Sequence, residues 1–227
     1  MKNATKSWIL LLLAASLLPL RAEVLDRIVA RVNRQAILLS EVEDELRFEQ
    51  FSSGSKAITT DPEEALQRLI DRTLIEQQMS RTSMPPAVAA EVHAKVADFR
   101  KQILPDADDS TWEQRLTTYN LTEGELEARL AQEVRIAHYI DMRFRATVRV
   151  SRAEIQDYYD KQFTPRFEQK GKAAPTLQKV SSQIVEILTQ QQINDQVTEW
   201  LQGLRGQSQI ETSLVPGQGS GNSGTAP

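Results

Sequence analysis

The chain has 227 residues, with 27 lysines and arginines against 31 aspartates and glutamates, and a formal net charge of −4 at pH 7. Without the N-terminal cations Lys2, Lys6 and Arg21 the balance is 24 against 31, a charge near −7. This charge argues against nucleic acid as the main partner, because phosphate binding needs a basic face. The chain contains no cysteine, which excludes disulfides, thiol chemistry and cysteine-based metal sites.

The first 22 residues are predicted to be a cleaved secretory signal peptide. Lys2 and Lys6 supply a positive start, and the apolar run Trp8–Leu18 is too short to span a bilayer comfortably. Ala22 offers a small residue at the cleavage position. An uncleaved membrane anchor is the alternative, because the residue two positions before Ala22 is a leucine. We expect the mature chain to begin at Glu23 and to contain no further membrane span.

Two short strands are predicted next. Ile28–Val32 and Ala36–Leu39 have the composition of strands, and Asn33-Arg34-Gln35 lies between them. Asparagine tolerates the left-handed backbone conformation that a tight turn requires. The pattern therefore predicts a small hairpin.

Helix starts are indicated by capping residues. Four serine or threonine residues are followed three positions later by glutamate, a capping box: Ser40/Glu43, Ser110/Glu113, Thr122/Glu125 and Ser151/Glu154. Asp61 followed by Pro62 marks a fifth start, with a capping carboxylate and a proline in the first turn. Pro85-Pro86 is expected to open a further helix that runs to about Leu104.

Three of these helices carry one apolar face. The stripes are Leu66, Leu69, Ile70, Thr73 and Leu74; Val88, Val92, Val96, Phe99 and Ile103; and Leu126, Leu130, Val134, Ala137, Ile140 and Phe144. Apolar residues at intervals of three and four predict helices that pack against each other, so these positions are interpreted as core. Thr147–Val150 is expected to be extended, and Arg152–Phe163 to form one more helix.

The C-terminal third begins with a predicted linker, Thr164–Pro175, which is bounded by prolines and contains a glycine. A long helix is predicted over Leu177–Arg205, with Gly206 as its C-terminal cap. Ser208–Leu214 could form a last short strand. The tail Pro216–Pro227 contains little that could be buried and is expected to be disordered.

Several segments together resemble the N- and C-terminal parts of SurA-type periplasmic chaperones. In family order they are Asp26–Asn33 with Ile37 and Ser40-Glu41-Val42, then Leu66–Ile75, then Val150–Tyr159, and finally Trp200–Arg205 with Ile210. These segments together span most of the mature chain, from Asp26 to Ile210. The resemblance implies a mainly α-helical chaperone core with a small β hairpin and a C-terminal strand, in which the N- and C-terminal parts form one composite domain.

The resemblance also defines the expected organisation. It consists of a signal peptide (1–22), an N-terminal helical part (23–163), a linker (164–175), a C-terminal helix and strand (176–215) and a disordered tail (216–227). In this family a parvulin prolyl isomerase domain normally stands between the two parts. Here only the linker occupies that place, so the isomerase domain is expected to be absent.

No catalytic site, metal site or cofactor is expected. The parvulin site uses paired histidines near an acidic or thiol residue, whereas this chain has only His93 and His138. Both are interpreted as surface or helix-interface residues. The acidic runs Glu41–Glu45 and Asp106–Asp109 are interpreted as a helix start and a solvated turn. The sequence has no glycine-rich phosphate loop and no nucleophile elbow, and the chain is therefore not expected to be an enzyme.

The aromatic side chains allow two interpretations. Most of them are expected to fill the core, while some could line a cradle for extended, aromatic-rich client segments. Tyr158, Tyr159, Phe163 and Phe167, beside the linker, are the candidates for client binding. The resemblance implies an ATP-independent holdase that binds unfolded outer-membrane proteins in the periplasm. The alternatives are an adaptor module of the envelope assembly machinery and a degenerate prolyl isomerase homologue.

Overall fold

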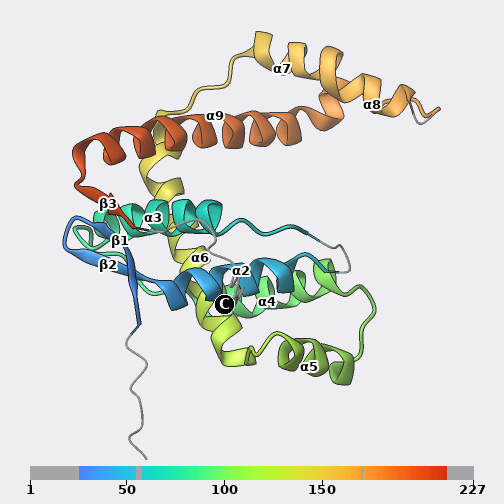
Figure 1. The fold of residues 1–227 in the computed structure, drawn as a ribbon. Coiled ribbons are helices and arrows are strands. Elements are labelled where there is room, and N and C mark those ends of the chain that lie inside the picture. Colours follow the sequence, from blue (N-terminus) through green and yellow to red (C-terminus); the bar gives the residue numbers. More distant parts are fainter. Residues whose placement is uncertain (1–25, 55–57, 170, 214–227) are drawn as a thin grey trace, which may run out of the picture.

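The computed structural model describes residues 26–54, 58–169 and 171–213. Its elements are β1 (Ile28–Val32), β2 (Gln35–Leu38), α2 (Leu39–Ser52), α3 (Pro62–Met79), α4 (Ala89–Ile103), α5 (Asp109–Thr118), α6 (Glu123–Phe144), η2 (Arg145–Thr147), α7 (Arg152–Tyr158), η3 (Tyr159–Phe163), α8 (Thr164–Glu168), α9 (Leu177–Gln207) and β3 (Ile210–Thr212). The described chain is mainly helical with a small sheet (Figure 1), which confirms the predicted fold class.

Two of the sequence predictions concern residues outside this description. The signal peptide, 1–22, and the tail, 216–227, lie beyond the described residues. Within the described ranges, no helix is both long enough and apolar enough to cross a membrane.

The sheet joins the two ends of the described chain. Its order is β2-β1-β3, with both neighbours antiparallel to β1. The β1–β2 turn contains Asn33 at φ 59°, so the predicted hairpin and the left-handed asparagine are confirmed. β3 pairs with the other edge of β1, with Ala30 opposite Thr212 and Val32 opposite Ile210. The predicted last strand is therefore present, and it completes the sheet that the N-terminal part begins.

The sheet packs on α3, and this contact forms the centre of the core. The cluster includes Val29, Val32, Ile37, Val42, Leu66, Ile70 and Leu74. Every member of the stripe predicted for α3 is buried, which confirms that interpretation. Leu204 of α9 and Ile210 of β3 pack against the same cluster. The C-terminal part therefore covers apolar surface that the N-terminal part would otherwise expose to water.

A second cluster lies among α2, α4, α5 and α6. It contains Phe48, Phe51, Ile103, Trp112, Leu116, Leu126 and Leu130. The rings of Phe51 and Trp112 lie 5.6 Å apart. The stripe predicted for α4 is wrong at Val88, which is 63% exposed. The helix begins only at Ala89, so Pro85 and Pro86 do not open it. The residue before a proline disfavours helical backbone, which keeps Met84 and Pro85 outside the helix.

Three predicted helix starts are confirmed. The Thr122 hydroxyl accepts from the Glu125 backbone N–H at 3.2 Å, and the Glu125 carboxylate accepts from the Thr122 N–H at 2.8 Å. Ser151 and Glu154 exchange the same two bonds at 3.2 and 2.7 Å. The Asp61 carboxylate accepts from a backbone N–H in the first turn of α3. These bonds satisfy backbone donors that a helix start leaves without partners.

The helix predicted from Ser40 is present, but Ser40 is not its cap. α2 begins one residue earlier, at Leu39. Glu41 accepts from the backbone N–H of Leu38 at 2.6 Å, while the Ser40 hydroxyl donates to the carboxylate of Asp26. That bond lowers the pKa of Asp26. The serine therefore ties the helix to the segment before β1 and does not cap the helix.

The helix predicted at Ser110 is also present, as α5, but Ser110 is not its cap. Asp108 caps α5, accepting from the backbone N–H of Thr111 at 2.8 Å. Hydrogen bonds from the side chain and from the backbone N–H of Thr111 lower the pKa of Asp108. A charged carboxylate is a stronger acceptor than a hydroxyl at a helix start. In α6, the predicted stripe is wrong at Ala137, which is exposed.

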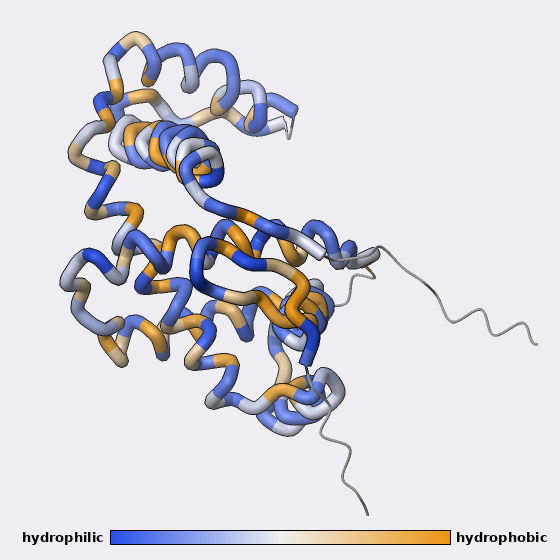
Figure 2. The backbone as a smooth tube through the Cα atoms, turned by 60° about the vertical axis from the view of Figure 1, so that its left-hand side comes forward, coloured by the Kyte–Doolittle hydropathy of each residue, from blue (hydrophilic) through white to orange (hydrophobic). Residues whose placement is uncertain are grey.

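α9 lies between two parts of the molecule (Figures 1 and 2). On one side it contacts α3 and α6, and on the other it contacts α7. We call the continuous helical segment Arg152–Glu168 the arm; it comprises α7, η3 and α8. The connection that precedes the arm is extended only over residues 148–150, because η2 takes up Arg145–Thr147.

The predicted linker starts later than expected. Thr164–Glu168 forms α8 and continues the arm, so the prediction of a linker from Thr164 is wrong. Pro165 lies in the first turn of α8, directly after the π-helical turn η3. A proline lacks an N–H and clashes with the preceding turn of a regular α-helix, and a widened turn at that place relieves both problems. The chain turns at Gly171, φ 65°, before it enters α9.

The C-terminal end of α9 also differs from the prediction. Gly206 lies inside the helix, which ends at Gln207. Ser208 follows with φ −106° and leads the chain in extended conformation toward β3. A glycine cap is favoured where a helix ends in a left-handed residue. No such residue is needed here, because the chain passes directly into a strand.

Trp200 of α9 provides a test of how α9 is anchored. Its ring lies 6.1 Å from that of Tyr139 and 5.5 Å from that of Phe144, and the Arg143 guanidinium lies 5.0 Å from its centre. The side chain is half-buried. Trp200→Ala is therefore expected to cost about 2 kcal/mol, below the roughly 3–5 kcal/mol of a fully buried tryptophan. Urea denaturation followed by circular dichroism measures this loss.

The control for this change is Val88→Ala, because Val88 is exposed and should alter the free energy of unfolding by less than about 0.5 kcal/mol. Equal values for the two variants would contradict the packing of α9 described here.

Candidate functional site

The arm carries a row of three aromatic rings, Tyr159, Phe163 and Phe167, which we call the aromatic row. The rings of Tyr159 and Phe163 are stacked, 5.8 Å apart with an interplanar angle of 18°. Those of Phe163 and Phe167 are 5.0 Å apart and tilted by 36°. All three side chains are half-buried. They keep part of their apolar surface available to a second molecule.

The π-helical turn explains why the three rings share one face. In an α-helix, a step of four residues exceeds one full turn by about 40°, so the side chains drift around the axis. A π turn closes one residue later, so the step from Tyr159 to Phe163 falls short of a full turn. The next step, from Phe163 to Phe167, lies in α8 and drifts the other way. The two drifts offset each other, and the rings stay aligned.

Tyr158 belongs to the core. It is 4% exposed and packs with Val180 and Ile184 of α9. Its assignment as a client-binding residue is therefore wrong: one position along a helix turns a side chain by about 100°, which places Tyr158 and Tyr159 on different faces. Tyr158 anchors the arm to α9. The Tyr159 hydroxyl donates to the backbone carbonyl of Pro175 at 2.9 Å and fixes the near end of the aromatic row.

Polar side chains hold α9 and the arm to the end of α6. Arg145 donates to both carboxylate oxygens of Glu186, at 2.9 and 3.0 Å, and these bonds raise the pKa of Arg145. Gln192 donates to Glu154 at 3.0 Å. Because these groups are exposed, each contact contributes little stability. Arg145 joins the end of α6 to α9, and Gln192 joins α9 to the arm.

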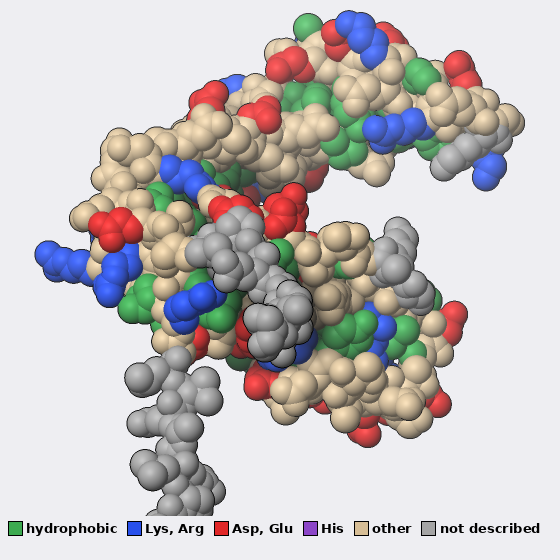
Figure 3. Space-filling model, viewed as in Figure 1, with side chains coloured by type: hydrophobic (Ala, Val, Ile, Leu, Met, Phe, Trp, Pro, Cys, Tyr) green, Lys and Arg blue, Asp and Glu red, His purple; other side chains and the backbone are tan. Residues whose placement is uncertain are grey.

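The surface is hollowed between the layer of α9 and the arm above and the lobe of α2, α4 and α5 below (Figure 3). Hydrophobic side chains gather along the seam between α9 and the arm, beside this hollow. The seam contains half-buried residues that pack around Tyr158, namely Ile155, Tyr159, Phe163, Leu177, Ile187 and Leu188. The layer above the hollow thus offers apolar side chains without a deep, closed pocket.

We call the sheet and helices α2 to α6 the body. A buried charge cluster lies inside it. The carboxylate of Glu45, 5% exposed, contacts Arg72 at 3.1 Å, Arg129 at 2.7 Å and Arg68 at 3.6 Å. Burial alone would raise the pKa of Glu45, but the charges of Arg129 and Arg72 hold that pKa below its ordinary value. The cluster joins α2, α3 and α6. Its geometry marks it as a structural tie between helices.

Sequence reasoning missed this cluster by treating Glu45 as one of several acids at a helix start. A signal was present: Val42, Glu45 and Phe48 are spaced by three and lie on the buried side of α2. A carboxylate on an apolar face needs cationic partners. The arginines of α3 and α6 supply them.

The two histidines lie apart from the arm. His93 of α4 contacts Glu127 of α6 at 3.3 Å, and His138 of α6 contacts Glu91 of α4 at 2.7 Å. Both histidines are exposed, and their interpretation as surface residues between helices is confirmed. Within the described ranges, no group of three or more histidine, cysteine, aspartate or glutamate side chains could hold a metal ion.

No protein-family model matches this chain, and no curated protein matches it either. The functional argument therefore depends on the geometry of the arm, the hollow and the sheet.

Proposed function

We propose that this chain is the core of a SurA-type periplasmic chaperone, an ATP-independent holdase that binds unfolded outer-membrane proteins in transit. The observation that carries the proposal is the aromatic row, three half-buried rings aligned on the arm. An aligned set of aromatic rings suits the reversible burial of apolar and aromatic side chains of an extended client. The hollow below the layer of α9 and the arm provides room for such a chain (Figure 3).

The arrangement of the two terminal parts also supports the proposal. β3 completes the sheet of β1 and β2, and α9 packs on α3 and α6. A composite core of this kind is what the resemblance implies. Between Phe163 and Leu177 the described chain contains α8 and a short connection, which supports the proposal of a chaperone core without the family's isomerase domain.

The proposed mechanism is shallow binding followed by passive release. The half-exposed rings offer contact area but no enclosed cavity, so affinity should be micromolar or weaker, about −8 kcal/mol or less in magnitude. Binding of this strength allows a client to leave without nucleotide hydrolysis. Backbone hydrogen bonds from an extended client would add to the apolar contact.

An aggregation assay tests the proposal. A urea-denatured outer-membrane β-barrel protein is diluted into buffer with and without the chain, and light scattering is followed. We expect the chain to suppress scattering at micromolar concentration. The suppression should change little between about 0.1 and 0.3 M salt, because apolar contact carries it and surface charges are already screened within about 8–10 Å.

Three outcomes separate the alternatives. Full aggregation in the presence of the chain would contradict the holdase proposal. Retention of one specific envelope protein, with no effect on several unfolded barrels, would favour an adaptor module. Acceleration of prolyl isomerisation in a peptide assay, lost in His93→Ala or His138→Ala, would favour a degenerate isomerase. We expect no acceleration.

A further inference from the structure

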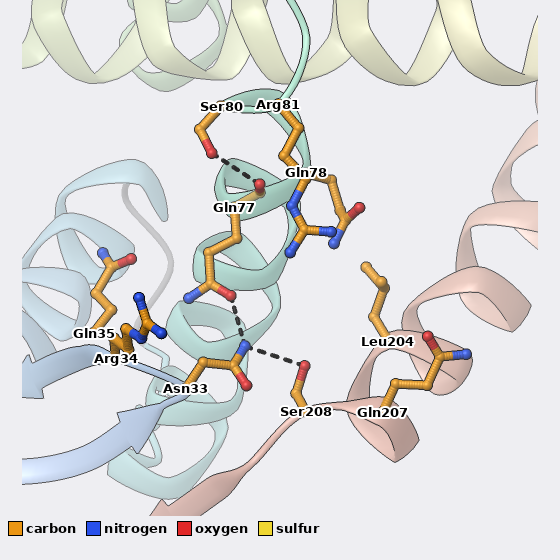
Figure 4. A pocket seen from close by; sticks show the side chains of 10 residues that line it. All are labelled: Asn33, Arg34, Gln35, Gln77, Gln78, Ser80, Arg81, Leu204, Gln207 and Ser208. Atoms are coloured by element: carbon orange, nitrogen blue, oxygen red, sulfur yellow. Dashed lines mark hydrogen bonds between the residues drawn. The ribbon is translucent and has the colours of Figure 1, made fainter.

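A cavity opens on the body where three segments distant in the sequence meet (Figure 4). The β1–β2 turn, the C-terminal end of α3 and the C-terminal end of α9 form its walls, and its volume is about 800 Å³. We call it the junction cavity. It lies on the body and shares no lining residue with the aromatic row.

Hydrogen bonds link the residues along one wall of the junction cavity. The Asn33 side-chain amide donates to the Gln77 side chain at 2.7 Å and to the Ser208 hydroxyl at 3.3 Å. Gln77 in turn donates to the backbone carbonyl of Val32 at 3.1 Å. Gln209 donates its backbone N–H to the Asn33 side-chain carbonyl at 3.0 Å. These bonds fix the three segments relative to one another, so the cavity has a defined shape.

The remaining lining side chains keep unused donors. Within the described residues, the guanidinium groups of Arg34 and Arg81 make no ion pair and no hydrogen bond, and the same holds for the carboxamides of Gln78 and Gln207. The Ser208 hydroxyl accepts from Asn33, which leaves its proton free to donate. Long polar side chains from all three segments therefore line one space with donors that have no protein partner among the described residues.

The charge of the lining is positive in a protein that is acidic as a whole. Arg34 and Arg81 both line the cavity, and no lining residue is an aspartate or glutamate. The C-terminal ends of α3 and α9 each contribute a partial charge of about −0.5. The two full positive charges outweigh these partial charges.

We propose that the junction cavity binds a phosphate-bearing anion. A phosphate group offers several acceptor oxygens in different directions, which suits donors from three walls, and guanidinium groups match its geometry. Ligand cavities of this size are usually lined mostly by apolar residues, whereas here Leu204 is the one large apolar side chain of the lining. The lining therefore selects a polar, anionic ligand over an apolar one.

Binding should stabilise the fold, because the ligand would contact the turn, α3 and α9 together. The test uses inorganic pyrophosphate as the free anion, with sodium chloride at equal ionic strength as the reference. At tenfold excess over its Kd, pyrophosphate should raise Tm by about 3–5 °C. Isothermal titration gives the Kd. The double variant Arg34→Gln/Arg81→Gln should bind at least tenfold more weakly, while Arg152→Gln, an exposed cation on the arm, should bind as the unchanged protein does.

A second measurement identifies the source of the phosphate. Cosedimentation with phosphatidylglycerol vesicles, compared with phosphatidylcholine vesicles, tests a lipid headgroup. Binding to either probe that is lost in Arg34→Gln/Arg81→Gln supports the proposal and shows whether the source is free or lipid-bound. The absence of binding to both probes, or equal binding by the double variant, would overturn it. Because these readouts do not involve clients, their outcome is independent of the holdase proposal.

Discussion

Glu45→Gln is expected to destabilise the protein by about 3 kcal/mol. The carboxylate is buried between Arg72 and Arg129, and its loss leaves two partly buried guanidinium groups without a counter-charge. Removal of one partner from a buried ion pair costs roughly 3–5 kcal/mol. We expect the lower end, because both arginines keep some exposure to water. Urea denaturation at pH 7 measures the loss, which should also lower Tm by about 6–12 °C.

The same cluster predicts how stability depends on pH. The folded pKa of Glu45 lies below its ordinary value of 4.5. Its stabilising contribution is therefore fully present above pH 4.5 and is lost as the pH falls through the lower, folded pKa. The difference in unfolding free energy between the unchanged protein and Glu45→Gln should be constant from pH 6 to 7. It should shrink on acidification below about pH 4.5.

Glu43→Gln is the matched control, because Glu43 is an exposed glutamate of the same helix with no ion pair among the described residues. It should change the free energy of unfolding by less than about 0.5 kcal/mol. A Glu45→Gln variant as stable as this control at pH 7 would show that the cluster does not tie α2, α3 and α6 together.

Truncation after Phe163 is expected to abolish the cooperative fold. The truncation removes β3 from the sheet and α9 from the body. It exposes the cluster of Ile75, Met79 and Tyr139, on which Trp200 and Leu201 of α9 pack. It also takes Leu204 and Ile210 from the central core. The fragment should be insoluble, or should bind a hydrophobic dye and unfold without a sharp transition.

Complementation provides the control for this truncation. A synthetic peptide of residues 176–213, added to the soluble fraction of the fragment, should restore a cooperative thermal transition. A fragment that unfolds cooperatively without the peptide would contradict the composite domain.

Periodicity predicted the parts of the fold in which one face is apolar. The α3 stripe from Leu66 to Leu74 packs as expected, since apolar residues at helical spacing must bury their common face. The β1–β2 hairpin followed from Asn33 and the flanking strand composition. The pairing of β3 with β1 is different, because no local pattern determines which strand a distant segment joins.

The errors arose where one residue type has two uses. Ser40 and Ser110 both have capping-box spacing. The Ser40 hydroxyl instead donates to the carboxylate of Asp26, and the carboxylate of Asp108 caps α5 in place of Ser110. Pro165 was interpreted as the beginning of a linker, although the preceding π-helical turn allows the helical segment to continue through it.

For the candidate site, the sequence predicted Tyr159, Phe163 and Phe167 as aromatic residues beside the predicted linker. It could not predict how their rings align. That alignment requires the π-helical turn at 159–163, which has no simple sequence signal. Tyr158 and Tyr159 are adjacent and chemically identical. Only the rotation of the arm against α9 determines that Tyr158 is core and that Tyr159 belongs to the aromatic row.

The affinity for an unfolded client in the double variant Phe163→Ser/Phe167→Ser tests the central claim most directly. Fluorescence anisotropy with a labelled, unfolded outer-membrane barrel segment gives the Kd, and thermal unfolding of the same samples gives Tm. We predict affinity at least tenfold weaker, about 1.4 kcal/mol, with Tm lowered by less than about 4 °C. Tyr158→Ser, the core control, should lower Tm by more than that. Unchanged affinity in the double variant, or a loss of affinity that merely follows a collapse of Tm, would contradict client binding by the aromatic row.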